Sequence, residues 1–327
     1  MKAINLKEFG GADNLFLDDV EKPAAGDGQV LIKVYATSVN RPDIVQRTGN
    51  YPPPKGDSEI LGLEVAGFVE SIGSRVTRYS VGDRVFALVG GGGYAEYAVA
   101  YEGHTMPVPD NLSFGQAACI CETYITAYLN AFVLAEAKVD DTFLLHGGGG
   151  GVNTAAIQLC KALCPKSTTV VTASTGKVAR VKELGVDHVI DYKTQSFVEE
   201  INSITNGKGV DIILDHIGAA YFTDNMKSLS LAGRLVVIGV MGGIKAEVNL
   251  AMMMVKRQKI IGSVLRSRPV AEKTAIIADF EKTVMPLFAN GTIEPLIHQV
   301  MPLDQAAVAH TAMEQGSHFG KIVLEVV

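Results

Sequence analysis

Five consecutive glycines, Gly147–Gly151, restrict the fold of this chain more than any other feature of its sequence. The residues before them, Thr142–Leu145, form a short apolar run rich in strand formers, and Val152–Leu163 has the apolar spacing of an amphipathic helix that Pro165 ends. Because glycine has no Cβ, a ligand can approach the backbone of such a turn, and the N–H groups at a helix N-terminus favour negative charge. Strand, glycine turn and helix together predict a diphosphate site, since a flexible linker would lack such closely flanking periodic elements.

The composition narrows the classes of function. The chain has 327 residues, 47% of them hydrophobic, which is enough for a large core and favours two domains. Its net charge is −6 without a long run of one sign, so nucleic acid is not an expected partner. No apolar stretch reaches membrane-spanning length, Met1–Glu8 lacks the core of a signal peptide, and the four cysteines lack the CxxC spacing of a structural zinc site. We therefore expect a cytoplasmic protein that does not bind membranes.

Two kinds of secondary-structure pattern divide the chain. Up to residue 123, short strand-like runs such as Gln29–Val39 and Glu64–Ile72 are separated by Gly, Pro, Asp or Ser, which predicts a barrel-like β domain. In residues 124–266 strands alternate with helices, which predicts a parallel, doubly wound sheet. Residues 267–327 are expected to return to the first domain. Two such domains leave a cleft between them, which is a usual place for a ligand.

The remaining predicted elements follow the same periodicities. The predicted strands are Arg84–Val89, Tyr94–Val99, Thr142–His146, Thr168–Thr172, His188–Ile190, Val210–Asp215, Arg234–Ile238, Lys259–Leu265, Ile297–Val300 and Lys321–Val327. The predicted helices are Thr175–Leu184, Ser196–Thr205, Tyr221–Leu229, Val270–Ala289 and Asp304–Gln315.

The end of the second strand of the predicted parallel sheet indicates the cofactor. A site for NAD usually has Asp or Glu there, which binds the ribose 2′-OH. In this chain Val170–Thr172 leads into Ala173–Lys177, which contains no acid. Ser174 and Lys177 can bind a 2′-phosphate, and Arg180, one helical turn further, is a weaker candidate. Lys177 and Arg180 can alternatively be solvated residues of a helix face, but their position after the glycine turn favours NADPH.

Ten short motifs, spread in order over nearly the whole chain, carry a family resemblance. They are Asn40–Asp43, Tyr51–Pro54, Ile60–Gly67, Val81–Val85, Gly92–Tyr97, Ile125–Tyr128, His146–Gly148, Thr154–Gln158, Leu265–Arg268 and Gly320–Val323. Each motif alone is weak, and their common order and spacing carry the assignment. The chain resembles the zinc-independent quinone oxidoreductases of the medium-chain dehydrogenase/reductase superfamily, in particular the p53-inducible quinone reductase type and its bacterial counterparts.

The resemblance implies a fold and an assembly. The fold is of the α/β class: a GroES-like β-barrel domain plus a Rossmann domain with a doubly wound parallel sheet, the C-terminal segment rejoining the barrel. Members are commonly dimers or tetramers and often pair through the last strand of the cofactor domain. The apolar strand near Lys259–Val264 is compatible with such pairing. We therefore expect a homodimer or homotetramer that acts on a small-molecule quinone or enone.

The resemblance also assigns site residues. Asn40, Asp43 and Tyr51 match the substrate side and are the candidate catalytic residues, and Thr126 matches a position near the nicotinamide ribose and amide. The other cofactor-binding candidates are Gly147, Gly150, Gly151, Val152 and Asn153 for the diphosphate; Ser174, Lys177 and Tyr192 for the 2′-phosphate; Gly239, Val240, Met241, Leu265, Arg266 and Ser267 around the nicotinamide; and Lys321 as a late contact.

One residue departs from the family pattern. Members usually have glycine where this chain has Asn153, the last position of the glycine pattern. That glycine permits close helix–strand packing and approach to the diphosphate. Asparagine is larger but can donate a hydrogen bond to phosphate, so we expect cofactor binding to be retained with an altered affinity.

Zinc alcohol dehydrogenases of the same superfamily are the alternative family. Their metal is held by a cysteine, by the histidine of a Gly-His-Glu motif and by another cysteine or acid. Here Asn40 and Leu63 stand at the first two positions, and no cysteine lies between Phe86 and Tyr97, where a structural zinc lobe would be. No metal is therefore expected. Without one, the substrate must accept a hydride or electrons unaided, as quinones and conjugated enones can.

Several alternatives stay open at this point. Tyr51, on a proline-rich loop, could cover the substrate, donate a proton or simply pack, and Asn40 and Asp43 could contact substrate or form a turn or helix cap. The expected activity is NADPH-dependent quinone reduction. One alternative is a C=C reductase acting on enones or enals. The other is a protein that holds NADPH as a lens crystallin or an RNA-binding protein, which salt-sensitive RNA binding displaced by NADPH would favour.

Overall fold

A computed structural model describes residues 1–326, which form two compact units. Unit 1 comprises Met1–Ile125 and the chain from Leu265 onward, and unit 2 comprises Thr126–Val264. Helix α3 (Cys121–Tyr128) runs across the first boundary, so it contributes residues to both units. The domain limits expected from the sequence, after residues 123 and 266, each lie two residues from these boundaries.

Unit 1 is organised around the long strand β3 (Gln29–Val39). One edge of β3 pairs with β4, while the other pairs with β6 over Gln29–Lys33 and with β15 over Ala36–Val39. A strand with three antiparallel partners curls the sheet, whose order is β14-β15-β3-β4-β5-β7 with β6 on β3. Its alternate residues Val30, Ile32 and Val34 are fully buried in one core cluster, as their period of two predicts. The barrel-like domain is thereby confirmed.

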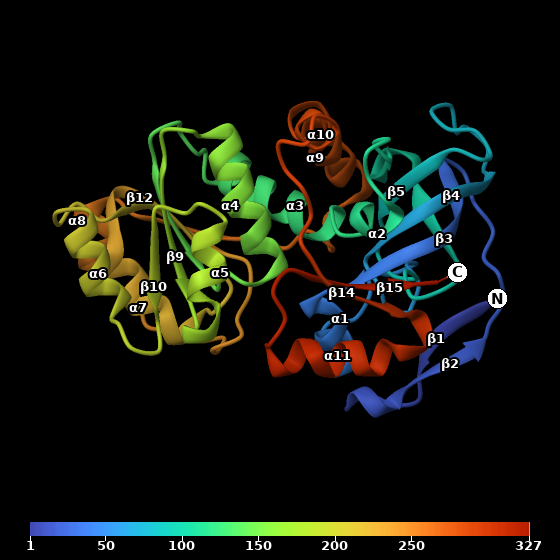
Figure 1. Cartoon of the computed structure of the whole chain (residues 1–327), viewed down its shortest axis with the longest axis horizontal. Helices are drawn as coiled ribbons and strands as arrows, with labels where there is room; N and C mark the ends of the chain where they lie inside the picture. Colours follow the sequence, from blue (N-terminus) through green and yellow to red (C-terminus); the bar gives the residue numbers. More distant parts are fainter. Residues whose placement is uncertain (327) are drawn as a thin grey trace. The chain divides into compact units, whose positions relative to one another are not determined.

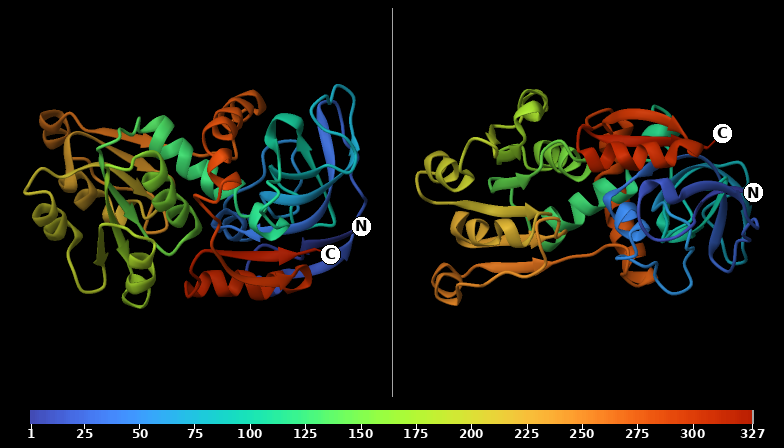
Figure 2. Two further views of the ribbon diagram at one scale, coloured as in Figure 1. Left: turned by 45° about the horizontal axis from the view of Figure 1, so that its top comes forward. Right: turned by 90° about the horizontal axis from the view of Figure 1, so that it is seen from below.

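A second core cluster fills the space between β15, the N-terminal strands and helix α11. It joins Ile322 and Leu324 of β15 to Ala306, Ala309 and Met313 of α11. Figure 2 shows α11, in red, lying beside β15. The C-terminal segment is therefore an integral part of unit 1. The other elements of unit 1 are β1 (Lys2–Leu6), η1 (Ala12–Asn14), β2 (Leu15–Asp19), α1 (Arg41–Arg47), β4 (Glu64–Ile72), β5 (Arg84–Leu88), β6 (Tyr97–Tyr101), η2 (Glu102–His104), β7 (Thr105–Pro107), α2 (Phe114–Ala117), α9 (Val270–Thr283), α10 (Met285–Ala289), β14 (Ile297–Pro302), η5 (Leu303–Gln305), α11 (Ala306–Gln315) and β15 (Lys321–Glu325).

Unit 2 contains a six-stranded parallel sheet with the strand order β10-β9-β8-β11-β12-β13. From β8 the chain moves outward in one direction through β9 and β10, and later in the other direction through β11, β12 and β13. Right-handed crossovers then place α4 and α5 on one face of the sheet and α6 and α7 on the other. The labels in Figure 1 locate these helices, and α6 and α7 pack against each other. This is the expected doubly wound Rossmann architecture.

The strands of unit 2 are short and buried, as parallel strands covered on both faces must be. Phe143, Leu144 and Leu145 of β8 are fully buried, and Ile212, Ile213 and Leu214 of the adjacent β11 are as well. The elements are η3 (Leu129–Leu134), β8 (Thr142–His146), α4 (Gly151–Leu163), β9 (Thr168–Ala173), η4 (Thr175–Lys177), α5 (Val178–Glu183), β10 (His188–Asp191), α6 (Phe197–Ile204), β11 (Val210–Asp215), α7 (Ala219–Ser228), β12 (Leu229–Val237), α8 (Leu250–Lys256) and β13 (Lys259–Gly262).

Several predicted elements differ in extent from those observed. The strand expected at Tyr94–Val99 is β6, Tyr97–Tyr101, and the strand expected to reach Leu265 ends at Gly262. The helix expected over Val270–Ala289 is two helices, α9 and α10, because Pro286 has no N–H to continue the hydrogen-bond ladder. The last predicted strand ends at Glu325, and Val327 lies outside the described residues.

Within residues 1–326, no helix has both the length and the apolar character needed to cross a bilayer.

Candidate active site

The glycine turn connects β8 to α4 and is held against the neighbouring strand β9. The N–H groups of Gly147 and Gly148 both donate to the carbonyl oxygen of Thr172, at 3.0 and 2.9 Å. Gly147 has φ +79°, which side chains disfavour, and a Cβ on Gly148 would lie 2.4 Å from Cγ1 of Val171. The first two glycines are therefore required by backbone conformation and by the close approach of the turn to β9.

The end of the turn leaves backbone donors unsatisfied. Helix α4 begins at Gly151 after Gly150, which provides no side-chain cap, and its first ladder bond runs from Thr154 N to Gly150 O, at 2.9 Å. The preceding N–H groups, of Gly151, Val152 and Asn153, have no acceptor within the helix. At the N-terminus of a 13-residue helix these donors, with the helix dipole, fit the diphosphate of a dinucleotide.

Asn153, which stands where the family pattern has its last glycine, has a buried side chain. Its side-chain nitrogen donates to the carbonyl oxygens of His146 and Gly147, at 2.6 and 3.2 Å, and the residue is 2% exposed. Its Oδ1 is buried without a hydrogen-bond partner in the described chain. The side-chain amide of Asn153 thus links the start of α4 to the end of β8 and to the glycine turn by hydrogen bonds. Both N–H groups of the Asn153 side chain bond the protein backbone, and a hydrogen bond from this side chain to phosphate stays a prediction.

Three candidates for a 2′-phosphate lie together at the carboxyl ends of β9 and β10. Ala173 and Asp191, the last residues of these strands, are paired in register, so Ser174 and Tyr192 directly follow adjacent strand ends. Lys177 ends the short helix η4 and donates its backbone N–H to Ser174 O, at 2.8 Å. Burial lowers the pKa of Lys177, and the nearby charge of Arg180 lowers it further.

The segment Gly239–Met241 follows β12 and is tied to the end of β11. The N–H of Met241 donates to His216 O at 3.1 Å, and the N–H of Ile238 donates to Asp215 O at 2.8 Å. The predicted nicotinamide segment and the glycine turn thus both lie at the carboxyl ends of the parallel strands of unit 2. Thr126 is half-buried on α3, where its carbonyl oxygen accepts from Nδ2 of Asn130, at 2.7 Å.

In unit 1, a buried ion pair contains Lys321. Its ammonium donates to Val39 O at 3.1 Å, to Glu64 Oε1 at 3.0 Å and to Oδ1 of Asn40, and the residue is 4% exposed. A lysine ammonium has three N–H donors, and all three are used. The assignment of Lys321 to cofactor binding stays a prediction, and in this structure its ammonium bonds only groups of unit 1.

Asn40 and Asp43 form the N-terminal cap of α1. The backbone N–H of Asn40 donates to Asp43 Oδ2 at 2.8 Å, and both halves of a capping box are present. Asp43 is fully buried and also accepts from Tyr94 OH, at 3.1 Å; burial raises its pKa to about 6, against lowering by the Asn40 N–H and the charge of Lys321. Asn40 is 5% exposed and donates to Glu64 Oε1 at 2.9 Å. The structure thus shows the helix cap, and direct substrate contact by this pair stays a prediction.

Tyr51 packs beneath the guanidinium of Arg266, whose Cζ lies 5.2 Å from the ring centroid. Arg266 is buried and donates to the backbone oxygens of Tyr51 and Gly90 and, at 2.7 Å, to Gln46 Oε1. Arg266 thus anchors the loop of Tyr51, while its neighbours in the predicted segment are buried Leu265 and exposed Ser267. Burial and the charge of Glu122 raise the pKa of Tyr51 to about 12, against a lowering by Arg266.

Glu122, at the start of α3, is a candidate that the sequence prediction missed. Its backbone N–H donates to Glu64 Oε2 at 2.9 Å, and its carboxyl group has no hydrogen-bond partner in the described structure. Burial, followed by the charges of Glu64 and Asp43, raises its pKa to about 8, although Lys321 and Arg266 act against this. It precedes Thr126 by four residues, so the two share one face of α3. That spacing was the available sequence signal.

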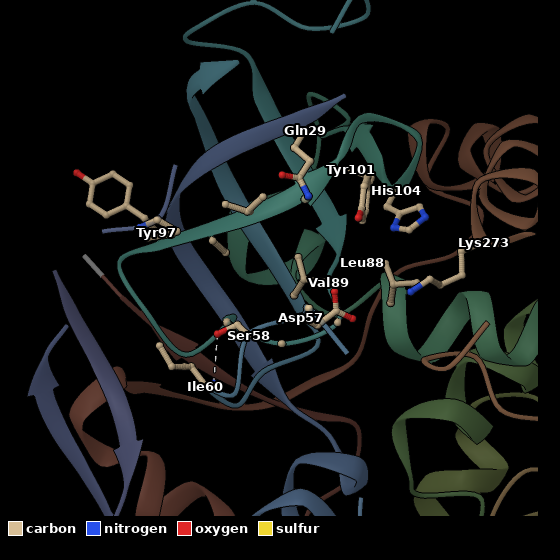
Figure 3. A pocket seen from close by; sticks show the side chains of 18 of the residues that line it. Gln29, Asp57, Ser58, Ile60, Leu88, Val89, Tyr97, Tyr101, His104 and Lys273 are labelled. Carbon is tan, nitrogen blue, oxygen red and sulfur yellow. Dashed lines mark hydrogen bonds between the residues drawn. The ribbon is translucent and has the colours of Figure 1, made fainter. Parts of the chain in front are cut away.

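A separate cavity of about 180 Å³ lies within unit 1. It is lined by the loops Gly56–Ser58 and Leu88–Gly92, by strand β6, by His104 and by Lys273. Figure 3 shows the Lys273 side chain extending toward Asp57 in this cavity. None of the three sequence-predicted catalytic residues lines it, so the cavity is not assembled from the predicted substrate site.

Within residues 1–326, no group of three or more His, Cys, Asp or Glu side chains is arranged to hold a metal ion. Asn40, which stands where the zinc enzymes of this superfamily have their first cysteine ligand, accepts from the ammonium of Lys321.

Comparisons with known proteins agree with the fold. Residues 26–110 match the alcohol dehydrogenase GroES-like domain, and residues 184–324 match a family model described as zinc-binding dehydrogenase. A quinone oxidoreductase from Rattus norvegicus is 34% identical over 99% of this chain and 97% of its own length. A mycobacterial structure complexed with NADPH is 29% identical, with a TM-score of 0.89 and full coverage of both chains. The CurK enoyl reductase is 25% identical, with a TM-score of 0.88 over 99% of this chain and 98% of that one.

The parallel sheet with its glycine turn, the GroES-like unit and the full-length match to a named relative point to one family. The chain belongs to the quinone oxidoreductase branch of the medium-chain dehydrogenase/reductase superfamily, whose Rossmann domains bind a nicotinamide cofactor.

Proposed function

We propose that this chain is an NADPH-dependent quinone reductase that works without a metal. The observation that carries the proposal is the group of side chains beyond the paired strand ends Ala173 and Asp191. Ser174 and Tyr192 supply hydroxyl groups there and Lys177 supplies a positive charge, which suit a 2′-phosphate. Strand β9 ends in alanine rather than in the acid that would bind a free 2′-OH. The similar mycobacterial structure complexed with NADPH supports the same choice.

The other cofactor contacts follow from the same row of strand ends. We assign the diphosphate to the N–H groups of Gly151, Val152 and Asn153, with Gly147 and Gly150 giving it access. We assign the nicotinamide side to Gly239–Met241 and to Thr126. When bound in its reduced form, nicotinamide supplies a hydride.

A quinone is the substrate class that best matches a site without a Lewis acid. Hydride addition to a quinone leaves a hydroquinone monoanion whose charge is delocalised over the ring and oxygen. The relative named quinone oxidoreductase, 34% identical over nearly the whole chain, supports this class. In this proposal Tyr51 packs on the substrate, and Arg266 acts through Tyr51 as a positioning residue.

The hydroquinone monoanion must gain one proton, and we assign its transfer to Glu122. Reduction of one quinone thus consumes one hydride and one proton. At neutral pH the Glu122 carboxyl holds its proton because its pKa is raised to about 8, whereas the Tyr51 phenol, near 12, is a weaker acid. The neighbouring carboxylate of Glu64 accepts from Ser38, Asn40, Lys321 and the Glu122 N–H.

A second candidate function is reduction of conjugated C=C bonds in enones or enals. The match to an enoyl reductase over 99% of this chain favours it, and the same hydride and proton would serve. The two candidates differ in substrate rather than in cofactor.

The test is a substrate panel. Initial rates of NADPH oxidation are measured with an ortho-quinone, a para-quinone and a conjugated enone at equal concentrations. Fast turnover of a quinone supports the proposal. Turnover of the enone alone would indicate a C=C reductase. Tight NADPH binding without turnover of any of the three substrates would favour a binding protein.

A further inference from the structure

His216 stands at the point of the unit 2 sheet where the strand order reverses. It follows Asp215, the last residue of β11, and β11 pairs with β8, the strand that ends at the glycine turn. The connections leave β8 and β11 in opposite directions, which opens a crevice for ligands at their carboxyl ends. A residue directly after β11 is therefore adjacent to whatever the glycine turn binds.

The imidazole ring of His216 lies against the first glycine of the turn. A Cβ built on Gly147 would be 2.8 Å from both Cε1 and Nε2 of the ring. On its other side, a Cβ on Gly239 would be 3.1 Å from the Cβ of His216. His216 thus lies between the predicted diphosphate turn and the predicted nicotinamide segment, and glycine at both positions makes room for it.

Asn153 also lies against this ring. Its Nδ2 is 3.5 Å from Nδ1 of His216. Both hydrogens of that amide bond the backbone oxygens of His146 and Gly147, so the contact with the ring is one of packing and does not select a tautomer. The residue that departs from the family's glycine pattern is therefore packed against this histidine.

We infer that His216 is a cofactor-binding residue of this chain, whose ring N–H donates to the phosphate nearer the nicotinamide, with Asn153 packed against the ring. The inference rests on binding of a nicotinamide cofactor at the glycine turn. It depends neither on the choice of NADPH over NADH nor on the quinone. It also gives Asn153 a role that glycine could not fill.

The test compares whole and partial ligands by isothermal titration calorimetry. The ligands are NADPH, 2′-phospho-ADP-ribose, which keeps the diphosphate and second ribose, and 2′,5′-ADP, which lacks both. If the protein prefers NADH, the corresponding set is NADH, ADP-ribose and AMP. The variants are His216→Leu and His216→Gln, with His188→Leu as the matched control because His188 is exposed at the opposite end of the sheet.

His216→Leu should weaken the first two ligands about tenfold or more, as expected for loss of a hydrogen bond to a charged group, and leave the adenosine fragment unchanged. His216→Gln retains an N–H donor and should lose less, and His188→Leu should bind all three as the parent protein does. Equal losses for all three ligands, or no loss for any, would overturn the inference. If His216→Leu does not fold, His216→Gln and Asn153→Ala are tested with 2′-phospho-ADP-ribose instead. Binding of this ligand by both variants with the affinity of the parent protein would also overturn the inference. A preference for NADH would contradict the proposed function alone.

Discussion

Lys321 and Glu64 form an ion pair in the interior of unit 1, with Nζ 3.0 Å from Oε1 and side chains 5% and 0% exposed. The two residues are 257 positions apart in the chain, so the pair joins the C-terminal strand β15 to β4. Through Asn40, which bonds both of them, it also positions the start of α1. The family resemblance had assigned Lys321, one member of this pair, to cofactor binding.

Replacement of Lys321 by methionine should destabilise the protein strongly. Glu64 would be left as a buried carboxylate without its cation, which typically costs about 3–5 kcal/mol in the free energy of unfolding. Chemical denaturation measures the change, and the double variant Lys321→Met/Glu64→Gln should recover much of it. A Lys321→Met protein of parental stability that binds NADPH weakly would instead support a direct contact between Lys321 and the cofactor.

Replacement of Lys177 by alanine should weaken NADPH far more than NADH, because only NADPH carries the 2′-phosphate. Loss of a charge-assisted contact predicts a fall of about tenfold or more in NADPH affinity. Binding titrations with both cofactors measure it, and Lys193→Ala, with Lys193 stacked 5.3 Å above the Tyr192 ring, is a control at the same sheet edge. Similar losses for the two cofactors would contradict the role of Lys177.

Glu122→Gln should remove the proton donor and change the pH profile. With a pKa of about 8, the parent protein holds the Glu122 proton at neutral pH and loses it as the pH rises, so kcat should fall above about pH 8. The variant should be about 10²-fold slower or more and lack that inflection. Steady-state rates from pH 6 to about 9.5 measure both. An inflection near pH 8 that persists in Glu122→Gln would assign it to another group.

The same carboxyl group predicts how stability depends on pH. Its pKa is raised from 4.5 to about 8, so within this window the folded protein keeps a proton that the unfolded chain has lost. Stability therefore falls as the pH rises through the window. In Glu122→Gln this part of the decline is absent. The Tm of the variant, relative to the Tm of the parent protein, should therefore rise between pH 6 and about 8.5. A constant difference in Tm would mean that Glu122 titrates normally.

Prolonged treatment with a strong chelator should leave quinone reduction unchanged. Asn40 and Leu63 stand where zinc enzymes of this superfamily have two of their ligands, and the Asn40 amide accepts from the ammonium of Lys321. Activity before and after dialysis against chelator measures this. Loss of activity that zinc restores would overturn the metal-free proposal.

The sequence predicted the sheet of unit 2 well because each strand ends in a local signal. Glycines follow β8, and Pro165 marks the end of the helix after them. The partners of Lys321 could not be predicted, for the opposite reason. Its partners are distant in sequence, so no local pattern indicates that Val39, Asn40 and Glu64 will surround its ammonium.

Asn153 and Glu122 show the same limit on a smaller scale. The departure at Asn153 was visible in the sequence, but the direction of its amide depends on the carbonyl groups that the glycine turn presents. Glu122 reads locally as an acid in the first turn of a helix, where such residues are common. Its raised pKa arises from burial and from Glu64 and Asp43, which tertiary folding brings near it.

The most direct test of the central claim is the ratio of kcat/KM for NADPH to that for NADH, measured with the same quinone. A bound 2′-phosphate at Ser174, Lys177 and Tyr192 predicts a ratio of about 10² or more. The ratio should fall toward one in Lys177→Ala. Equal use of the two cofactors, or a preference for NADH, would contradict the account, since the side chains at the ends of β9 and β10 would then have no phosphate to bind.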